Sequence, residues 1–179
     1  MHVVRLLYFF LIFTFQNNVY FFSVANEDCP TIIKRSVWTT QNAKSLNYLI
    51  LPLPYVVIQH TVTPGCDTKA KCISSVEIFF KNIFLIGGDG NIYEGCGWNR
   101  EGAHTYGYNK KSIGIGFIGN FQANSMVEAA HKLIVCGKSE GILRENVRVI
   151  GARQVGSTAS PGAKLYEQIQ NWPEWVATP

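Results

Sequence analysis

Several short apolar segments, each of strand length, limit what this chain can fold into. Residues 55–58, 112–120 (SIGIGFIGN) and 147–150 are rich in β-branched residues, which is typical of buried strands. Glycines in the second segment indicate that another group approaches its backbone closely. In NIFLIGGDGNIYEG, residues 83–86 and 92–94 flank a glycine-rich turn, which predicts a hairpin.

Three other segments have helical signatures. Residues 73–80 predict a short helix, and residues 163–172 predict a final one that a proline ends. In residues 125–137 a serine and a glutamate three positions later fit a capping box, and apolar residues follow one face. His131 falls on the opposite face, where we expect an ordinary surface histidine. This order of strands and helices predicts a mixed α/β fold with a single-layer sheet and helices against it.

The N-terminus has the pattern of a secretory signal peptide. One arginine precedes an apolar run over residues 6–15, and small residues at 23–25 offer a cleavage site. The run is too short to favour a membrane span, and an uncleaved interfacial anchor is the alternative. We therefore expect residues 1–25 to be a signal peptide and residues 26–179 to form one secreted, extracellular domain with no membrane attachment.

The net charge and the cysteines indicate which classes of partner and which cellular compartment to expect. The chain has 16 Lys and Arg against 12 Asp and Glu, without the basic stripe or aromatic ladder of nucleic-acid binders, so we expect no nucleic-acid partner. In an exported chain the five cysteines are first interpreted as disulfides. Cys66 and Cys72 can close a local loop, and Cys29 and Cys136 can tie the N-terminus to the body. Cys96 is the odd one, either buried as a thiol or available to another chain.

Two kinds of catalytic centre deserve consideration. A zinc site could draw only on His60, His104 and Cys96, and nothing in their spacing favours it. A serine hydrolase could use Ser157 or Ser160, but no nucleophile elbow surrounds them, and turn or cap roles are favoured. Polar residues nevertheless gather at strand ends and loops, which suits a neutral, hydroxyl-rich ligand such as a sugar-peptide.

Several blocks of sequence together carry a family resemblance. YVVIQHTVTPGC, FLIGGDGNIYEG, GAHTYGYN, SIGIGFIGNF and STASPGAKLYEQIQNWPEW occur in the order found in peptidoglycan recognition proteins, relatives of the bacteriophage-type zinc amidases. The chain resembles the short, secreted arthropod members over residues 29–175. The resemblance implies a central mixed β-sheet, about three helices and a groove that holds muropeptide.

The resemblance also implies that the chain is not an amidase and needs no cofactor. The zinc ligands of amidase members fall at Gln59, Ala152 and Ser160, which we call the zinc-equivalent positions. An assisting tyrosine falls at or near Asn82. Glutamine and serine are poor zinc ligands and alanine is none, so no metal would activate water. His60, beside the first position, contacts ligand in binding members.

The implied role is innate immune recognition of bacterial peptidoglycan, with signalling through a glucan-binding-type recognition protein and a serine protease towards Toll-type defence. The alternatives are a residual peptidoglycan hydrolase, either an amidase or Ser160-dependent, and a binding-defective variant. Trp98 could equally be a core residue. The peptidoglycan-binding positions carried over are His60, Thr61, Trp98, His104, Asn109, Thr158 and Ser160. We expect the disulfides to be Cys66–Cys72 and Cys29–Cys136.

One departure from the family pattern concerns the segment after Cys72. Only residues 73–83 separate that cysteine from Phe84, where the family has a longer helix and a loop. The absent stretch carries a groove wall and the residues that discriminate lysine from diaminopimelate in the stem peptide. We therefore expect a shortened first helix and a more open groove, unless the transcript lacks a segment. Cys96 also stands where an arginine is common.

Overall fold

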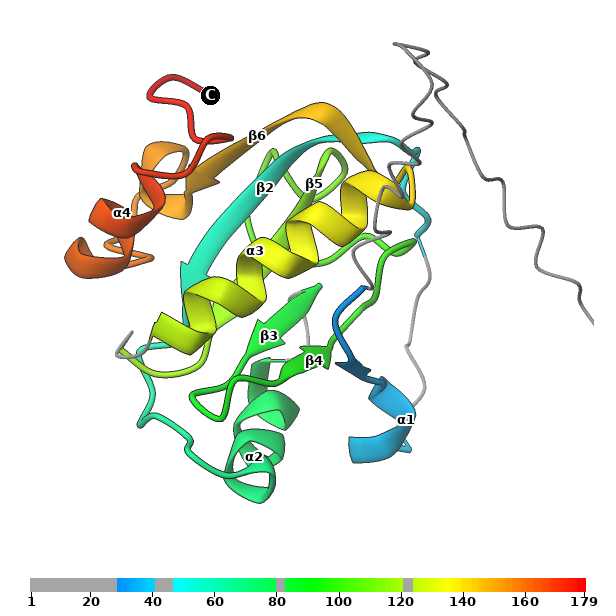
Figure 1. Ribbon diagram of the computed structural model, residues 1–179, viewed down its shortest axis with the longest axis vertical. Helices are drawn as coiled ribbons and strands as arrows, with labels where there is room; N and C mark the ends of the chain where they lie inside the picture. Colours follow the sequence, from blue (N-terminus) through cyan, green and yellow to red (C-terminus); the bar gives the residue numbers. More distant parts are fainter. Residues whose placement is uncertain (1–28, 41–46, 80–82, 121–123) are drawn as a thin grey trace, which may run out of the picture.

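A six-stranded mixed sheet forms the centre of the protein (Figure 1). The computed structural model describes residues 29–40, 47–79, 83–120 and 124–179, so the predicted signal peptide lies outside the described residues. The strand order is β1-β4-β3-β5-β2-β6, and every neighbouring pair is parallel except the β3–β4 hairpin. The strands are β1 Ile32–Ile33, β2 Leu53–His60, β3 Phe84–Ile86, β4 Ile92–Glu94, β5 Ser112–Phe117 and β6 Leu143–Gly151. The predicted α/β class and the predicted hairpin are confirmed.

The helices differ in their bounds from those predicted. They are α1 Arg35–Trp38, α2 Lys69–Phe79, α3 Asn124–Ser139, the 3₁₀ turn η1 Ala152–Gln154 and α4 Ala163–Ile169. Ser125 lies inside α3, and Glu128 pairs with Lys132 at 2.8 Å, so these two residues do not form the expected capping box. Only residues 80–83 separate α2 from β3, so the segment after α2 is as short as the sequence indicates.

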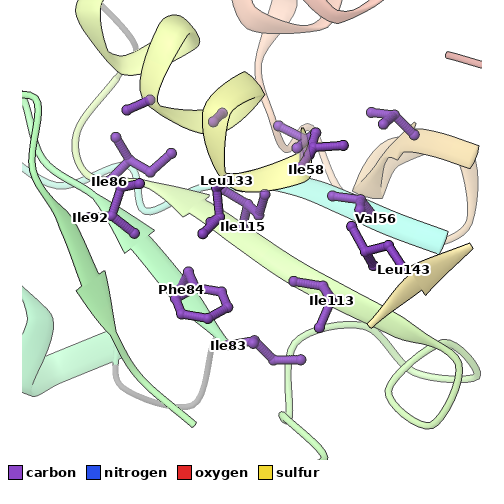
Figure 2. Close-up of a cluster of buried hydrophobic side chains, with 14 of the residues drawn as sticks. Val56, Ile58, Ile83, Phe84, Ile86, Ile92, Ile113, Ile115, Leu133 and Leu143 are labelled. Atoms are coloured by element: carbon purple, nitrogen blue, oxygen red, sulfur yellow. The ribbon is translucent and has the colours of Figure 1, made fainter. Parts of the chain in front are cut away.

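One face of the sheet is covered by α3 and α4 (Figure 1). Successive side chains of a strand point to opposite faces, so Val56 and Ile58 of β2 point to this side. They belong to a fully buried cluster that includes Ile115 of β5 and Leu133 of α3 (Figure 2). The apolar face of α3 therefore packs against the apolar residues that alternate along the central strands.

The opposite face, which we call the α2 face, holds the other residues of the same strands. Leu85 of β3 and Tyr93 of β4 pack with Val76 of α2. Tyr55 and Val57 of β2 form a separate small cluster, with further residues of β6 and η1. Between these two clusters lie the carboxyl ends of β5 and β2, where ligand sites of open α/β sheets commonly form.

Two disulfides hold loops and the N-terminal segment. Cys66 and Cys72 are bonded, and so are Cys29 and Cys136, which joins the start of the described chain to α3. These are the two pairs expected. Cys96 takes part in neither, and burial raises the pKa of its thiol while two nearby arginines oppose that shift.

His131 is not the plain surface residue that its helical position suggests. Its ring lies edge-on to Trp172, with ring centroids 4.2 Å apart, and it is half-buried. Burial lowers the pKa of His131, and the nearby Glu174 partly opposes this shift. The segment after α4 folds back to place Trp172 there, which helical periodicity alone does not predict. None of the helices in the described ranges has the length and hydrophobicity that a bilayer crossing requires.

Candidate functional site

The three zinc-equivalent positions meet at the carboxyl ends of adjacent strands. Gln59 is the penultimate residue of β2, and the β2–β6 register pairs Ile58 with Gly151, so Ala152 follows beside Gln59. The Oγ atom of Ser160 lies 3.0 Å from the backbone nitrogen of His60, from which it accepts a hydrogen bond. Residues separated by about a hundred positions thus converge at the carboxyl end of β2.

Gln59 points its amide at the loop after residue 103. Its Nε2 donates to the carbonyl oxygen of His104 at 2.7 Å and to Oγ1 of Thr105 at 3.0 Å. Both amide hydrogens are therefore used to hold that loop against the end of β2. At this position the side chain supports the architecture of the site.

His60 and Ser160 form a close pair. Nδ1 of His60 lies 3.1 Å from Oγ of Ser160, and the backbone nitrogen of Ser160 donates to Oγ1 of Thr158 at 3.1 Å. Burial lowers the pKa of His60, and a backbone hydrogen bond partly offsets that shift. The imidazole is consequently neutral near pH 7, with one ring nitrogen engaged by the serine.

His104 lies over the backbone of β5. The ring packs so closely on Gly114 that a Cβ added to that glycine would be 2.6 Å from the Cγ of His104. Burial lowers the pKa of His104 to about 4, a shift that the carbonyl of Ser112 partly opposes. Nε2 of His104 is buried and makes no hydrogen bond of ordinary geometry within the described residues. Such a polar atom needs a partner, which a ligand or a water can supply.

Asn109 and Thr61 shape the backbone around the site. Oδ1 of Asn109 accepts hydrogen bonds from the backbone nitrogens of His104 and Thr105, at 3.0 and 2.8 Å. Oγ1 of Thr61 lies 2.7 Å from Oγ1 of Thr63 and accepts from the nitrogen of Gly119 at 2.9 Å. Asn109 leaves its amide nitrogen without a partner in the described part of the chain, so it keeps a donor for a ligand.

Trp98 is placed elsewhere. Its ring meets Phe84 edge-on, with centroids 4.5 Å apart, and it packs against the core beneath α3, close to Gly137. The structure therefore favours the core alternative for this residue. The remaining residues form what we call the polar cluster: Gln59, His60, Thr61, His104, Thr105, Asn109, Thr158 and Ser160.

Thr105 is one of the polar residues that the sequence places in loops, but it is not among the binding positions that the family resemblance carries over. It is buried, and its hydroxyl accepts from Gln59 while lying 3.3 Å from Nδ1 of His104. It lies in the quoted block GAHTYGYN between two selected residues, so the block itself was the available signal.

Comparison with known proteins places the chain in one family. A family model described as N-acetylmuramoyl-L-alanine amidase matches residues 51–163. Peptidoglycan-recognition protein SA of Drosophila melanogaster is 43% identical over 168 residues, which cover 85% of this chain and 83% of that protein. The chain belongs to the peptidoglycan recognition protein family.

Solved structures of this family share the fold. The bumblebee PGRP-SA structure superposes with a TM-score of 0.82 at 60% identity, covering 84% of this chain and 100% of that one. The structure of peptidoglycan recognition protein LE in complex with tracheal cytotoxin, a monomeric diaminopimelic acid-type peptidoglycan, gives a TM-score of 0.78 at 38% identity. That match covers 81% of this chain and 95% of that one.

The residues at the zinc-equivalent positions do not fit a zinc ion. An amide, a methyl group and a neutral hydroxyl replace the imidazole and thiolate donors that zinc prefers. The amide of Gln59 is also turned towards the loop, and Ala152 is buried in the small apolar cluster with Val57. Over the described ranges, no group of three or more His, Cys, Asp or Glu side chains could hold a metal ion.

Proposed function

We propose that this chain is a secreted, non-catalytic recognition protein that binds bacterial peptidoglycan through the polar cluster. The observation that carries the proposal is a contrast within one site. The zinc-equivalent positions hold an amide, a methyl and a hydroxyl, while hydrogen-bonding groups around them stay positioned on the sheet. Without a metal the site lacks the means to activate water, but it keeps what a neutral sugar-peptide requires.

Some residues of the polar cluster fix its loops in place, and others have atoms that can form hydrogen bonds with a ligand. Gln59 and the oxygen of Asn109 fix the loop that carries His104. Nε2 of His104 and the amide nitrogen of Asn109 remain for a ligand. Each neutral hydrogen bond contributes about 1 kcal/mol net, so several must act together to give useful affinity.

Family membership supports the biological part of the proposal. A relative's structure contains a monomeric peptidoglycan, which supports the same class of ligand here. The likeness to PGRP-SA proteins supports signalling through a protein partner, for which we propose a glucan-binding-type recognition protein and a serine protease leading to Toll-type defence. The N-terminal signal pattern and the two disulfides support an extracellular location.

Two measurements on the purified mature protein test the proposal together. We expect no stoichiometric zinc by elemental analysis, no peptide released from peptidoglycan, and retention on insoluble peptidoglycan. His104→Ala should weaken retention, whereas His131→Ala, which truncates a histidine on α3 at the other face, should leave it unchanged. Chelator-sensitive amide cleavage, or equal retention of the His104 variant and the parent protein, would contradict the proposal.

The short connection after α2 bears on specificity. Because residues 80–83 alone join α2 to β3, contacts from that side of the site should be few. Losing two or three hydrogen bonds of about 1 kcal/mol each weakens affinity roughly 30- to 150-fold. We expect weak binding with little discrimination between lysine and diaminopimelate muropeptides in a titration. Tight, sharply selective binding would show that specificity does not reside in that segment.

One geometric observation favours a second candidate function, a Ser160-dependent hydrolase. Oγ of Ser160 lies 3.1 Å from Nδ1 of His60, a distance at which a histidine can accept a serine proton. However, within the described residues no carboxylate is bonded to the other ring nitrogen, so the orienting member of a triad is lacking. If the serine is a nucleophile, muropeptide turnover should occur without metal and vanish in Ser160→Ala. If Ser160 only supports binding, neither the parent protein nor the Ser160→Ala variant will turn over muropeptide.

A further inference from the structure

A cluster of two cations and two tyrosines occupies the other end of the α2 face. Tyr55 is the first of the β2 residues that point to the α2 face. Its ring lies edge-on to that of Tyr108, with 5.2 Å between the ring centroids. The Nζ of Lys111 lies 4.0 Å from the centroid of Tyr108, and the guanidinium of Arg148 lies 4.1 Å from the centroid of Tyr55. We call these four residues the cationic cluster.

The cluster is separate from the polar cluster. Tyr55 pairs with Ser112 and Arg148 at the start of the β2 ladder, whereas Gln59 comes four residues later on the same face. At about 3.3 Å per residue, the two clusters lie about 13 Å apart along β2. A ligand at the Gln59 end of β2 therefore leaves the Tyr55 end available, although the two clusters adjoin where the backbone nitrogen of Tyr108 donates to the carbonyl oxygen of Thr105.

The charges of the cluster are not neutralised. In the part of the chain that the structure describes, neither Lys111 nor Arg148 forms an ion pair with an acidic side chain. Glu145 and Glu174 line a pocket of about 310 Å³ together with Arg148, but neither is ion-paired with it, and Glu174 pairs with Lys138. Two positive charges thus meet on one face without a counter-ion.

The hydroxyls add further donors. Neither Tyr55 nor Tyr108 makes a hydrogen bond through its hydroxyl to another described residue. Burial raises the pKa of Tyr108, the nearby Tyr55 adds to the shift, and Arg148 opposes it, so the three groups lie within electrostatic reach. Stabilisation of the rings by the cations is the plain structural role of this arrangement. It does not account for four unpaired donor groups on one face.

We propose that the cationic cluster is a binding site for a phosphate group. A carboxylate offers two oxygens and a single negative charge to these four donor groups, whereas a phosphate presents additional oxygens and, as a monoester, a charge of about −1.5 to −2 that matches the two cations. The site therefore takes a phosphate monoester or diester, either as a free ion or as part of a polymer. Its ligand is distinct in chemistry from the neutral sugar-peptide assigned to the polar cluster.

The test is a titration of the full mature protein, followed by NMR, at constant ionic strength. Inorganic phosphate, a glycerol-phosphate oligomer and acetate serve as three separate probes. We expect saturable shifts of the Tyr55 and Tyr108 ring signals with phosphate, and much weaker ones with acetate. Lys111→Gln and Arg148→Gln should each weaken phosphate binding about tenfold, the loss of one charge-assisted contact.

Lys110→Gln is the matched control, since it removes the same charge from an exposed neighbour that makes no contact with either ring. Its phosphate affinity should stay close to that of the parent protein. Binding by the oligomer as well as by the free ion assigns the site to a polymer phosphodiester, and binding by the ion alone assigns it to free phosphate. The absence of saturable shifts, equal binding of acetate, or an equal loss in Lys110→Gln would overturn the proposal, whatever happens to muropeptide binding.

Discussion

The close approach of His104 to β5 allows a sharp test of how the polar cluster is held. Gly114 is not in a left-handed conformation, so alanine can adopt its backbone angles. The added Cβ, however, would lie 2.6 Å from Cγ of His104 and 2.9 Å from its Cδ2 and Nδ1. Real Cβ atoms do not come so close to a ring, so Gly114→Ala must displace His104.

The backbone cannot easily make room instead. β5 lies between β2 and β3 and is paired to both, which fixes the position of Gly114. Overpacking of this kind typically destabilises by about 1–3 kcal/mol. We therefore expect Gly114→Ala to lower the free energy of unfolding by that amount and to weaken retention on peptidoglycan, because the displaced ring no longer keeps its place in the polar cluster.

A double-mutant cycle with His104→Ala isolates the contact. His104→Ala removes the three atoms that lie nearest to the added Cβ, and alanine in a strand is favoured over glycine by roughly 0.5–1 kcal/mol. In that background Gly114→Ala should be neutral or slightly stabilising. Urea unfolding followed by tryptophan fluorescence measures all four corners of the cycle. If Gly114→Ala destabilises both backgrounds equally, the His104 ring does not cause the strain and the reasoning is wrong.

Two further predictions concern stability. The sequence separation is 107 for Cys29–Cys136 and 6 for Cys66–Cys72. The chain-entropy relation therefore predicts that paired Cys→Ala variants lose about 4.8 and about 2.2 kcal/mol of unfolding free energy, respectively. Equal losses on urea unfolding would contradict this relation. The pKa of His104 is lowered from 6.5 to about 4, so its contribution is present above pH 6.5 and is lost as the pH falls towards 4. Between pH 7 and pH 5 this loss is about 2 kcal/mol, and His104→Ala should remove that part of the pH dependence.

Much of the fold could be predicted because the strands carry their own signals. The apolar runs that form β2 and β5 are buried on both faces over most of their length, which gives near-continuous apolar sequence. The bounds of α3 and α4 were less accurate, because capping and the folding back of Trp172 depend on contacts that helical periodicity does not contain.

The members of the polar cluster could be predicted as polar residues at strand ends and loops, but the roles assigned to them came from the family resemblance. His60 and Ser160 are a hundred residues apart, and nothing in their local sequence indicates that their side chains are 3.1 Å apart. The cationic cluster was missed for a related reason. Tyr55 and Arg148 come together through the β2–β6 register, which shifts by several residues near Leu53, and a register is not visible in either strand alone.

The contacts of Gln59 bear on how a recognition site can arise on an amidase fold. A zinc ligand at this position would direct its donor towards a metal, whereas the amide directs both of its hydrogens to the loop of His104 and Thr105. Gln59, which lacks the donor that zinc prefers, is thus also the residue that secures the loop of His104. Replacing Gln59 by a histidine would remove at least one of these two bonds without supplying the other two metal ligands. On the proposed function, support of the loop and absence of a zinc ligand are therefore linked at this one position, and Gln59→His should weaken retention on peptidoglycan without producing a zinc site.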